Sequence, residues 1–218
     1  MANDPWAFGW TQLLTIIGFC ITIGIAIGGF KTFGRWKREK IDELRMTIAL
    51  EALSIAYETQ FVFDGIRNPG SFGNEYADMK RGENESLEQY EASKTGYPTL
   101  KRVDDNKDFF QRVFKLQPRF MAVFGPQTEV IFKELYQARA NVVVSAQAIS
   151  RYDDGPFTEA KAKRRTRYEG DIWSGAADSY SHEELPEGDR VQKRLDEFKN
   201  GISTLCRPVV DQEFRSTK

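Results

Sequence analysis

The sequence comprises 218 residues with 31 Lys and Arg, 32 Asp and Glu and one His, which gives a formal net charge of -1. Hydrophobic residues make up 40% and charged residues 29%. The chain is therefore too apolar for a disordered tail and too charged for a polytopic membrane protein. The near-neutral charge argues against a protein whose main task is to coat nucleic acid. Two Cys and one His exclude a Cys₄ or Cys₂His₂ zinc site within the chain.

The N-terminal region contains a run of 26 residues, Pro5–Phe30, without a charged side chain. A helix needs about 20 apolar residues to cross the hydrocarbon core of a bilayer. Trp6 and Trp10 precede the apolar part and Trp36 follows it, and indole rings favour the two membrane interfaces. A secretory signal peptide would have a basic start, and a buried soluble helix is rarely uncharged on every face. We therefore predict an uncleaved transmembrane helix over about residues 10–33.

The charges around this span predict its orientation. Five basic residues follow the uncharged run Pro5–Phe30 and none precedes it: Lys31, Arg35, Lys37, Arg38 and Lys40. The positive-inside rule then places the N-terminus outside and the C-terminal side in the cytoplasm. The same cations can attract anionic lipid headgroups, so membrane lipid is an expected partner. Cys20 and Cys206 lie far apart in the chain, and we expect no disulfide between them.

Small residues recur every four positions within the span, at Cys20, Gly24 and Gly28. This spacing stacks them on one helix face, where the backbone of another helix can approach closely. The alternative is that glycine is simply common in membrane helices. The uncharged part of the span, up to Phe30, holds no residue that would indicate a proton relay or an ion site.

The rest of the sequence has helical periodicity. Apolar residues from Ile41 to Ile66 follow spacings of three and four, so the membrane helix can continue into the first helix of the following domain. Asn68-Pro69-Gly70 ends that helix, and residues 68–98 read as a long loop with a short helix around Leu87–Ala92.

Further helices are expected after this loop. No stretch alternates apolar and polar residues as a strand would. The predicted fold is all-α, with a transmembrane anchor in residues 1–36 and a cytoplasmic four- to five-helix bundle in residues 37–218. The predicted helices are Thr99–Phe124, with Thr99 as N-cap and a kink or break at Pro118, then Gln127–Tyr152, a weaker Phe157–Trp173, and Glu187–Val210.

Candidate catalytic residues are few. His182 lies in a polar loop, and a bundle di-metal site requires two Glu-x-x-His motifs. Asp104, Asp105 and Asp108 could present two carboxylates for Mg²⁺, although acidic residues also occur near helix N-termini without binding metal. No Gly-x-Ser-x-Gly elbow or P-loop is present. We expect no catalytic set, metal or cofactor.

Two surface features are candidate binding sites. The first is a basic cluster near Tyr168 that could contact phosphate groups of lipid, or less favourably nucleic acid, unless it is only a solvated face diluted by neighbouring acids. The second is a turn that could recognise a protein partner, unless it is a structural helix end in which Asp64 pairs with Arg67. The cluster comprises Lys161, Lys163, Arg164, Arg165 and Arg167, and the turn comprises Asp64, Arg67, Asn68, Pro69, Gly70 and Phe72.

Several segments together resemble bacterial single-pass inner-membrane proteins with a cytoplasmic helical domain. They include Trp10–Phe33, Arg35-Trp36-Lys37-Arg38-Glu39-Lys40, Tyr57–Phe72, Asn106–Phe110, Phe124-Gly125-Pro126 and Leu205-Cys206-Arg207-Pro208. The resemblance implies a bacterial inner-membrane location. It implies no activity and no cofactor.

We expect a non-enzymatic tether or accessory subunit that associates with itself or with a larger membrane complex. One alternative is a membrane-bound, metal-dependent hydrolase that uses Asp104, Asp105 and Asp108. The other is a sensor of anionic lipid surfaces that uses Lys163, Arg164 and Arg165. Nucleic acid is the least favoured partner.

Overall fold

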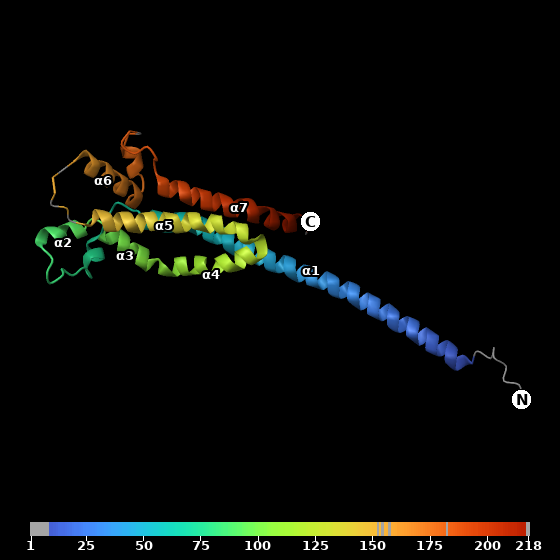
Figure 1. The fold of residues 1–218 in the computed structure, drawn as a ribbon. Helices are drawn as coiled ribbons and strands as arrows, with labels where there is room; N and C mark the ends of the chain where they lie inside the picture. Colours follow the sequence, from blue (N-terminus) through green and yellow to red (C-terminus); the bar gives the residue numbers. More distant parts are fainter. Residues whose placement is uncertain (1–8, 152, 154, 157, 182, 217–218) are drawn as a thin grey trace, which may run out of the picture. The chain divides into compact units, whose positions relative to one another are not determined.

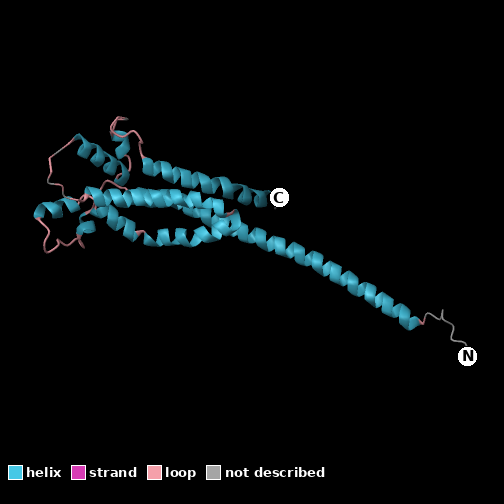
Figure 2. Ribbon diagram, viewed as in Figure 1, coloured by secondary structure: helices cyan, strands magenta, loops and turns pink. Residues whose placement is uncertain are grey.

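The computed structural model describes residues 9–151, 153, 155–156, 158–181 and 183–216. These residues form helices joined by turns and loops and contain no strand (Figures 1 and 2), so the all-α prediction is confirmed. The α-helices are α1 (Trp10–Ile66), α2 (Leu87–Ser93), α3 (Tyr97–Asp105), α4 (Lys107–Phe124), α5 (Glu129–Ile149), α6 (Glu159–Ile172) and α7 (Arg190–Ser216). Three short 3₁₀ helices are η1 (Gly73–Tyr76), η2 (Pro126–Thr128) and η3 (Ala176–Ser179).

The chain divides into two compact units, Met1–Met46 and Thr47–Lys218, and α1 contributes to both. The helix is continuous through the boundary, as its apolar spacing predicted. α1 is the one helix in the described part of the chain that is long and apolar enough to cross a membrane, judged by length and composition. Membrane crossing itself, its direction and the predicted domain boundary at residue 36 remain predictions.

The second unit is a helical bundle with an aromatic core. Phe63 of α1 meets Phe110 of α4 with ring centroids 6.1 Å apart. Phe120 of α4 meets Phe132 of α5 at 5.4 Å, and Phe132 meets Phe198 of α7 at 5.9 Å. All three pairs are edge-to-face, the arrangement that the ring quadrupole favours. Their rings therefore join the C-terminal part of α1 to α4, α5 and α7 in one core.

The helix predicted over Thr99–Phe124 is in fact two helices. α3 begins after Gly96 and has Pro98 in its first turn, where the missing N–H costs nothing, so the predicted N-cap role of Thr99 is wrong. The helix is interrupted at Asn106, whose side-chain amide donates to the Arg102 carbonyl at 2.8 Å. Pro118, the expected break point, lies inside α4 without ending it. Pro118 is exposed, so its ring lies outside the core of the bundle.

The other helices agree more closely with expectation. The short helix predicted in the long loop is α2, which starts at a capping box between Ser86 and Gln89. α5 and α6 are slightly shorter than predicted, and α7 continues beyond Val210 to Ser216 with Pro208 inside it. The described residues contain seven α-helices because the loop helix and the break at Asn106 add to the expected bundle. Tyr152 and Phe157, two of the predicted helix ends, lie outside the described residues.

Candidate functional site

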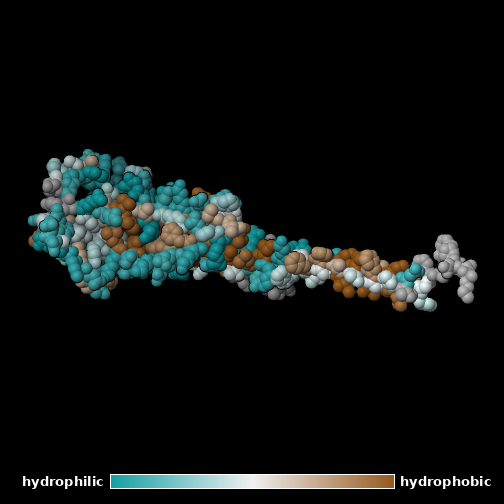
Figure 3. Space-filling model, turned by 60° about the horizontal axis from the view of Figure 1, so that its bottom comes forward, coloured by the Kyte–Doolittle hydropathy of each residue, from teal (hydrophilic) through white to brown (hydrophobic). Residues whose placement is uncertain are grey.

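The N-terminal part of α1 exposes large apolar side chains all round its axis. Leu14, Phe19 and Ile25 are 65%, 67% and 70% exposed. The apolar window of this helix has no residue buried within the structure. Figure 3 shows the resulting hydrophobic surface along this segment. Such an uninterrupted apolar surface is typical of a segment that another apolar phase or protein covers.

The predicted interfacial residues flank this segment. Trp10 is 82% exposed, and Trp36 is 53% exposed with its ring 5.7 Å from that of Phe33. Among the flanking cations, Arg35 lies 3.8 Å from Glu39 and Lys40 lies 2.6 Å from Glu43. Arg38 donates to the Gly34 carbonyl, and Lys31 and Lys37 are exposed on the same helix. Trp6 lies outside the described residues.

The small-residue positions of the predicted span have open space around them. A Cβ atom added at Gly24 or Gly28 would meet nothing within 4 Å, and Cys20 is exposed. The Thr22 hydroxyl donates to the Gly18 carbonyl of its own helix at 2.8 Å. Among the described residues, the space beside Gly24 and Gly28 is therefore open, and packing against another helix remains a prediction.

The predicted partner-binding turn contains one residue that is not accessible. Arg67 is 1% exposed, and its guanidinium donates to the carbonyls of Gly170 and Asp171 at 2.8 Å each. It also forms an ion pair with Asp189 at 2.8 Å. The alternative pair with Asp64 is not formed, because Asp64 is exposed and accepts from Gln60. Arg67 is therefore an internal anchor of the bundle and not a contact residue for an external partner.

The other residues of the turn are exposed, and hydrogen bonds from Arg102 hold their backbone in place. This guanidinium donates to the carbonyls of Asn68 at 2.6 Å and Gly70 at 2.5 Å, and it pairs with Glu75 of η1 at 2.6 Å. The hydrogen bond from Arg102 keeps the pKa of Glu75 below its usual value. Pro69 is exposed, and Phe72 is 69% exposed. The turn thus presents a fixed backbone with an exposed aromatic ring.

A buried ionic cluster at Arg67 was not predicted from the sequence. Asp171 is 2% exposed and accepts two hydrogen bonds from Arg190, at 2.6 and 2.5 Å, and one from Ser145. Together with the Arg67–Asp189 pair, it ties the end of α1 to α5, α6 and the start of α7. Charges this deeply buried are stable only when every partner is in place. The only sequence signal was that Arg and Asp occur next to apolar residues, and this does not show which of them form pairs.

The predicted basic cluster lies on α6, where acidic neighbours neutralise most of it. Lys163 pairs with Glu159 at 2.8 Å and Arg165 with Glu169 at 2.9 Å, both within one helical turn. Arg167 lies 3.8 Å from Glu187. Lys161 and Arg164 point instead to a cavity beside the end of α5.

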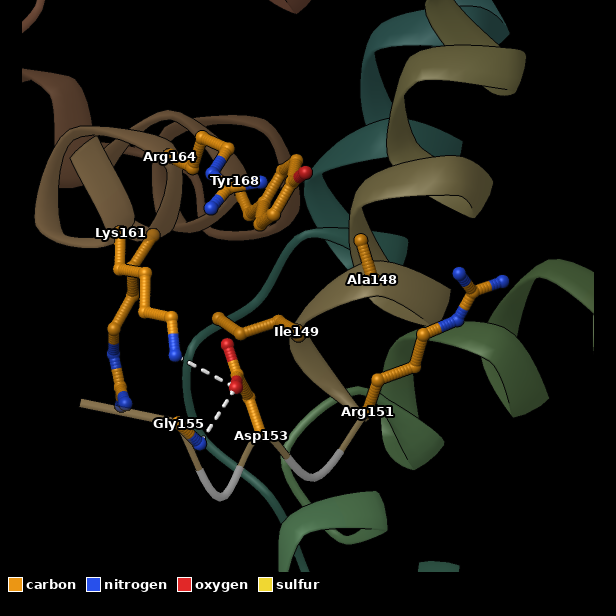
Figure 4. A pocket seen from close by; sticks show the side chains of 9 residues that line it. Ala148, Ile149, Arg151, Asp153, Gly155, Lys161, Arg164 and Tyr168 are labelled. Atoms are coloured by element: carbon orange, nitrogen blue, oxygen red, sulfur yellow. Dashed lines mark hydrogen bonds and ion pairs between the residues drawn. The ribbon is translucent and has the colours of Figure 1, made fainter. Parts of the chain in front are cut away.

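This cavity has a volume of about 640 Å³. Thr158 is the N-cap of α6: its hydroxyl accepts from the Lys161 amide, and this cap fixes the direction of the first turn. Lys161 reaches Asp153 at 2.7 Å, and the same carboxylate accepts from the Gly155 amide at 3.1 Å (Figure 4). Both hydrogen bonds hold the pKa of Asp153 below its usual value. The opposite wall contains Ile149 of α5.

The candidate catalytic residues do not converge. Asp104 and Asp105 end α3, whereas Asp108 lies in the first turn of α4, beyond the break at Asn106. All three side chains are exposed. Within the described ranges, no group of three or more His, Cys, Asp and Glu side chains could hold a metal ion. His182 lies outside those ranges, and Cys206 is buried, which raises the pKa of its thiol to about 12.

Fold and sites together define a helical protein with an exposed apolar N-terminal helix, a helical bundle and a basic cavity. No family model, curated protein or solved structure matches the chain.

Proposed function

We propose that this chain is a membrane-tethered interaction module or an accessory subunit of a larger membrane complex. The observation that carries the proposal is the exposed, uncharged N-terminal part of α1, from Trp10 to Phe30. Burial of apolar surface is worth roughly 25 cal/mol per Å², so insertion of this segment into a bilayer is strongly favourable. Its length in residues matches what a single crossing requires.

The direction of insertion follows from the flanking charges. The first basic side chain is Lys31, and four more follow before residue 41. The positive-inside rule favours a cytoplasmic location for these residues and for the bundle that follows them. In this proposal the N-terminus lies outside a bacterial inner membrane, the location that the resemblance of the sequence implies.

Two accessible surfaces would serve association with a protein partner. In the membrane, the face with Cys20, Gly24 and Gly28 allows close approach of another helix. In the cytoplasm, the rigid turn of Asn68, Pro69 and Gly70 with exposed Phe72 would contact a protein partner. We favour this role over the hydrolase alternative because the three aspartates lie on two helices and do not converge.

Thiol accessibility tests the proposed topology. The native cysteines give little background, because Cys206 is buried and Cys20 lies in the proposed span. We expect Gly9→Cys to react with a membrane-impermeant maleimide on intact spheroplasts, and Lys115→Cys of α4 to react only after lysis. Both positions are exposed in the structure.

The wild-type chain is the control for background labelling. Labelling of Lys115→Cys on intact spheroplasts would place the bundle outside and contradict the topology. Recovery of a chain that lacks the apolar segment from membranes would contradict the anchor itself.

A further inference from the structure

A second site lies in the cavity between the C-terminal end of α5, the following segment and the first turns of α6. We propose that this cavity binds a phosphoryl group of a phosphate ester. The inference is independent of the membrane anchor, since every residue that carries it belongs to the second unit. Of the five basic residues that the sequence predicts as a binding cluster, the proposed site uses two, Lys161 and Arg164.

The first argument is the charge of the cavity wall. The described lining residues carry four basic side chains, from Arg151, Lys161, Arg164 and Arg165, against one carboxylate, that of Asp153. Arg165 is paired with Glu169 and Lys161 with Asp153, and the Arg151 side chain points away from Asp153 and Lys161 (Figure 4). Among the described lining residues, Arg164 is therefore the cation that adds positive charge beside the Lys161–Asp153 pair. A mouth with this excess of positive charge attracts an anion, and partial enclosure between helices strengthens the attraction relative to an open surface.

The second argument is the supply of hydrogen-bond donors. Among the described residues, the Arg164 side chain donates one hydrogen bond, to the Ala160 carbonyl of its own helix at a long 3.4 Å. A guanidinium carries five N–H donors in a planar fork, so most of its capacity is left for a ligand. Paired N–H groups match two oxygens of a phosphoryl group, which is the strongest mode of binding open to Arg.

The third argument is that the cavity already contains one carboxylate of the protein, bound by nearby donor groups. The Asp153 carboxylate takes the Lys161 ammonium and the Gly155 amide as donors, and Arg164 lies close enough to stabilise its charge. These groups are therefore arranged to stabilise oxygen-borne negative charge at one point. Asp153 is exposed and close to α6, so an incoming phosphoryl group would compete with it for Lys161.

The fourth argument concerns size and the apolar walls. About 640 Å³ exceeds the volume of a phosphate ion and falls in the range of pockets for small organic ligands. Tyr168 and Ile149 offer an aromatic and an aliphatic surface beside the cations (Figure 4). The ligand class is thus a phosphate attached to an organic body. Such a group can belong to a soluble phosphate ester or to the headgroup of a lipid.

Calorimetric titration of the full-length chain with inorganic pyrophosphate tests the site, with the protein held in phosphatidylcholine nanodiscs. We expect saturable binding that Arg164→Gln weakens by roughly tenfold, because one charge-assisted contact is lost. Asp153→Asn keeps an oxygen for the Gly155 amide but removes the competing charge, and we expect it to strengthen binding by a similar factor. Lys163→Gln is the matched control, since it removes the same charge from an exposed position of α6 outside the cavity.

Opposite effects of Arg164→Gln and Asp153→Asn cannot arise from a loss of folding, and they would support the site. Absence of saturable binding, equal weakening by Arg164→Gln and Lys163→Gln, or no gain from Asp153→Asn would overturn it. The same titration in nanodiscs with phosphatidylglycerol separates the two sources of the phosphoryl group. Loss of pyrophosphate binding there assigns the cavity to a lipid headgroup, and retained binding assigns it to a soluble phosphate ester.

Discussion

Arg67 is a single side chain that links several segments of the helical bundle. Its guanidinium satisfies the carbonyls of Gly170 and Asp171 in the last turn of α6, and it neutralises Asp189 just before α7. Two segments that lie more than 100 residues from Arg67, the end of α6 and the residue just before α7, are thereby fixed to the end of α1. Lys could not replace it, because an ammonium lacks the planar fork that reaches several acceptors at once.

At the residue scale, we predict that Arg67→Ala lowers the free energy of unfolding of the bundle by roughly 3–5 kcal/mol. The substitution leaves Asp189 without its partner and two buried carbonyls without a donor. Arg112→Ala is the control, since Arg112 forms a half-exposed ion pair with Glu58 and should cost at most about 1 kcal/mol. Thermal or denaturant unfolding of both variants measures the difference. Similar losses would show that Arg67 is no more than an ordinary surface charge.

At the scale of elements, the start of α3 depends on packing that a sequence pattern does not reveal. Gly96, the N-cap of α3, lies directly against the end of α5, where its amide donates to the Ser150 hydroxyl at 3.1 Å. The contact is so close that a Cβ atom on Gly96 would lie 2.1 Å from the Ala146 carbonyl oxygen. Glycine is therefore required here by close approach of two helices and not by its backbone angles.

We predict that Gly96→Ala destabilises the bundle by roughly 1–3 kcal/mol, because the backbone of α5 cannot move aside as a side chain can. Hydrogen exchange of the α3 amides should rise relative to those of α7. Gly65→Ala is the matched control: a Cβ atom there meets nothing within 4 Å, and alanine favours the helix. An unchanged stability of Gly96→Ala would mean that α3 is not held against α5 in solution.

At the scale of the whole molecule, the Cys20 thiol in the proposed anchor allows self-association to be tested by disulfide formation. If two copies pack through the face with Cys20, Gly24 and Gly28, their Cys20 thiols come close together. We predict that mild oxidation of native membranes with copper phenanthroline yields a disulfide-linked dimer. Cys206 should not contribute, because it is buried and its thiol has a pKa raised to about 12.

Gly24→Leu and Gly28→Leu should abolish this dimer, since a large side chain prevents close approach of the two helices. Gly29→Leu is the control, because Gly29 lies about 140° around the helix from Gly24 and about 180° from Cys20, and its surroundings are equally open. If all three variants form the dimer to the same extent, the small-residue face is not the contact.

The sequence alone determined the helical class, the continuous α1, the short α2 and the approximate extent of α5, α6 and α7. These features depend on local information: apolar spacing, capping residues and the Pro-Gly turn act within a few residues of one another. Only the tertiary structure decided that Arg67 is buried, that the chain breaks at Asn106, and that Lys161 and Arg164 meet Asp153 at one cavity. The burial of Arg67 and the contacts at the cavity join segments whose approach no local pattern encodes, since the energy of a buried charge is set by what lies opposite it. The break at Asn106 coincides with a hydrogen bond from its side chain to the Arg102 carbonyl, which the apolar spacing of the sequence does not reveal.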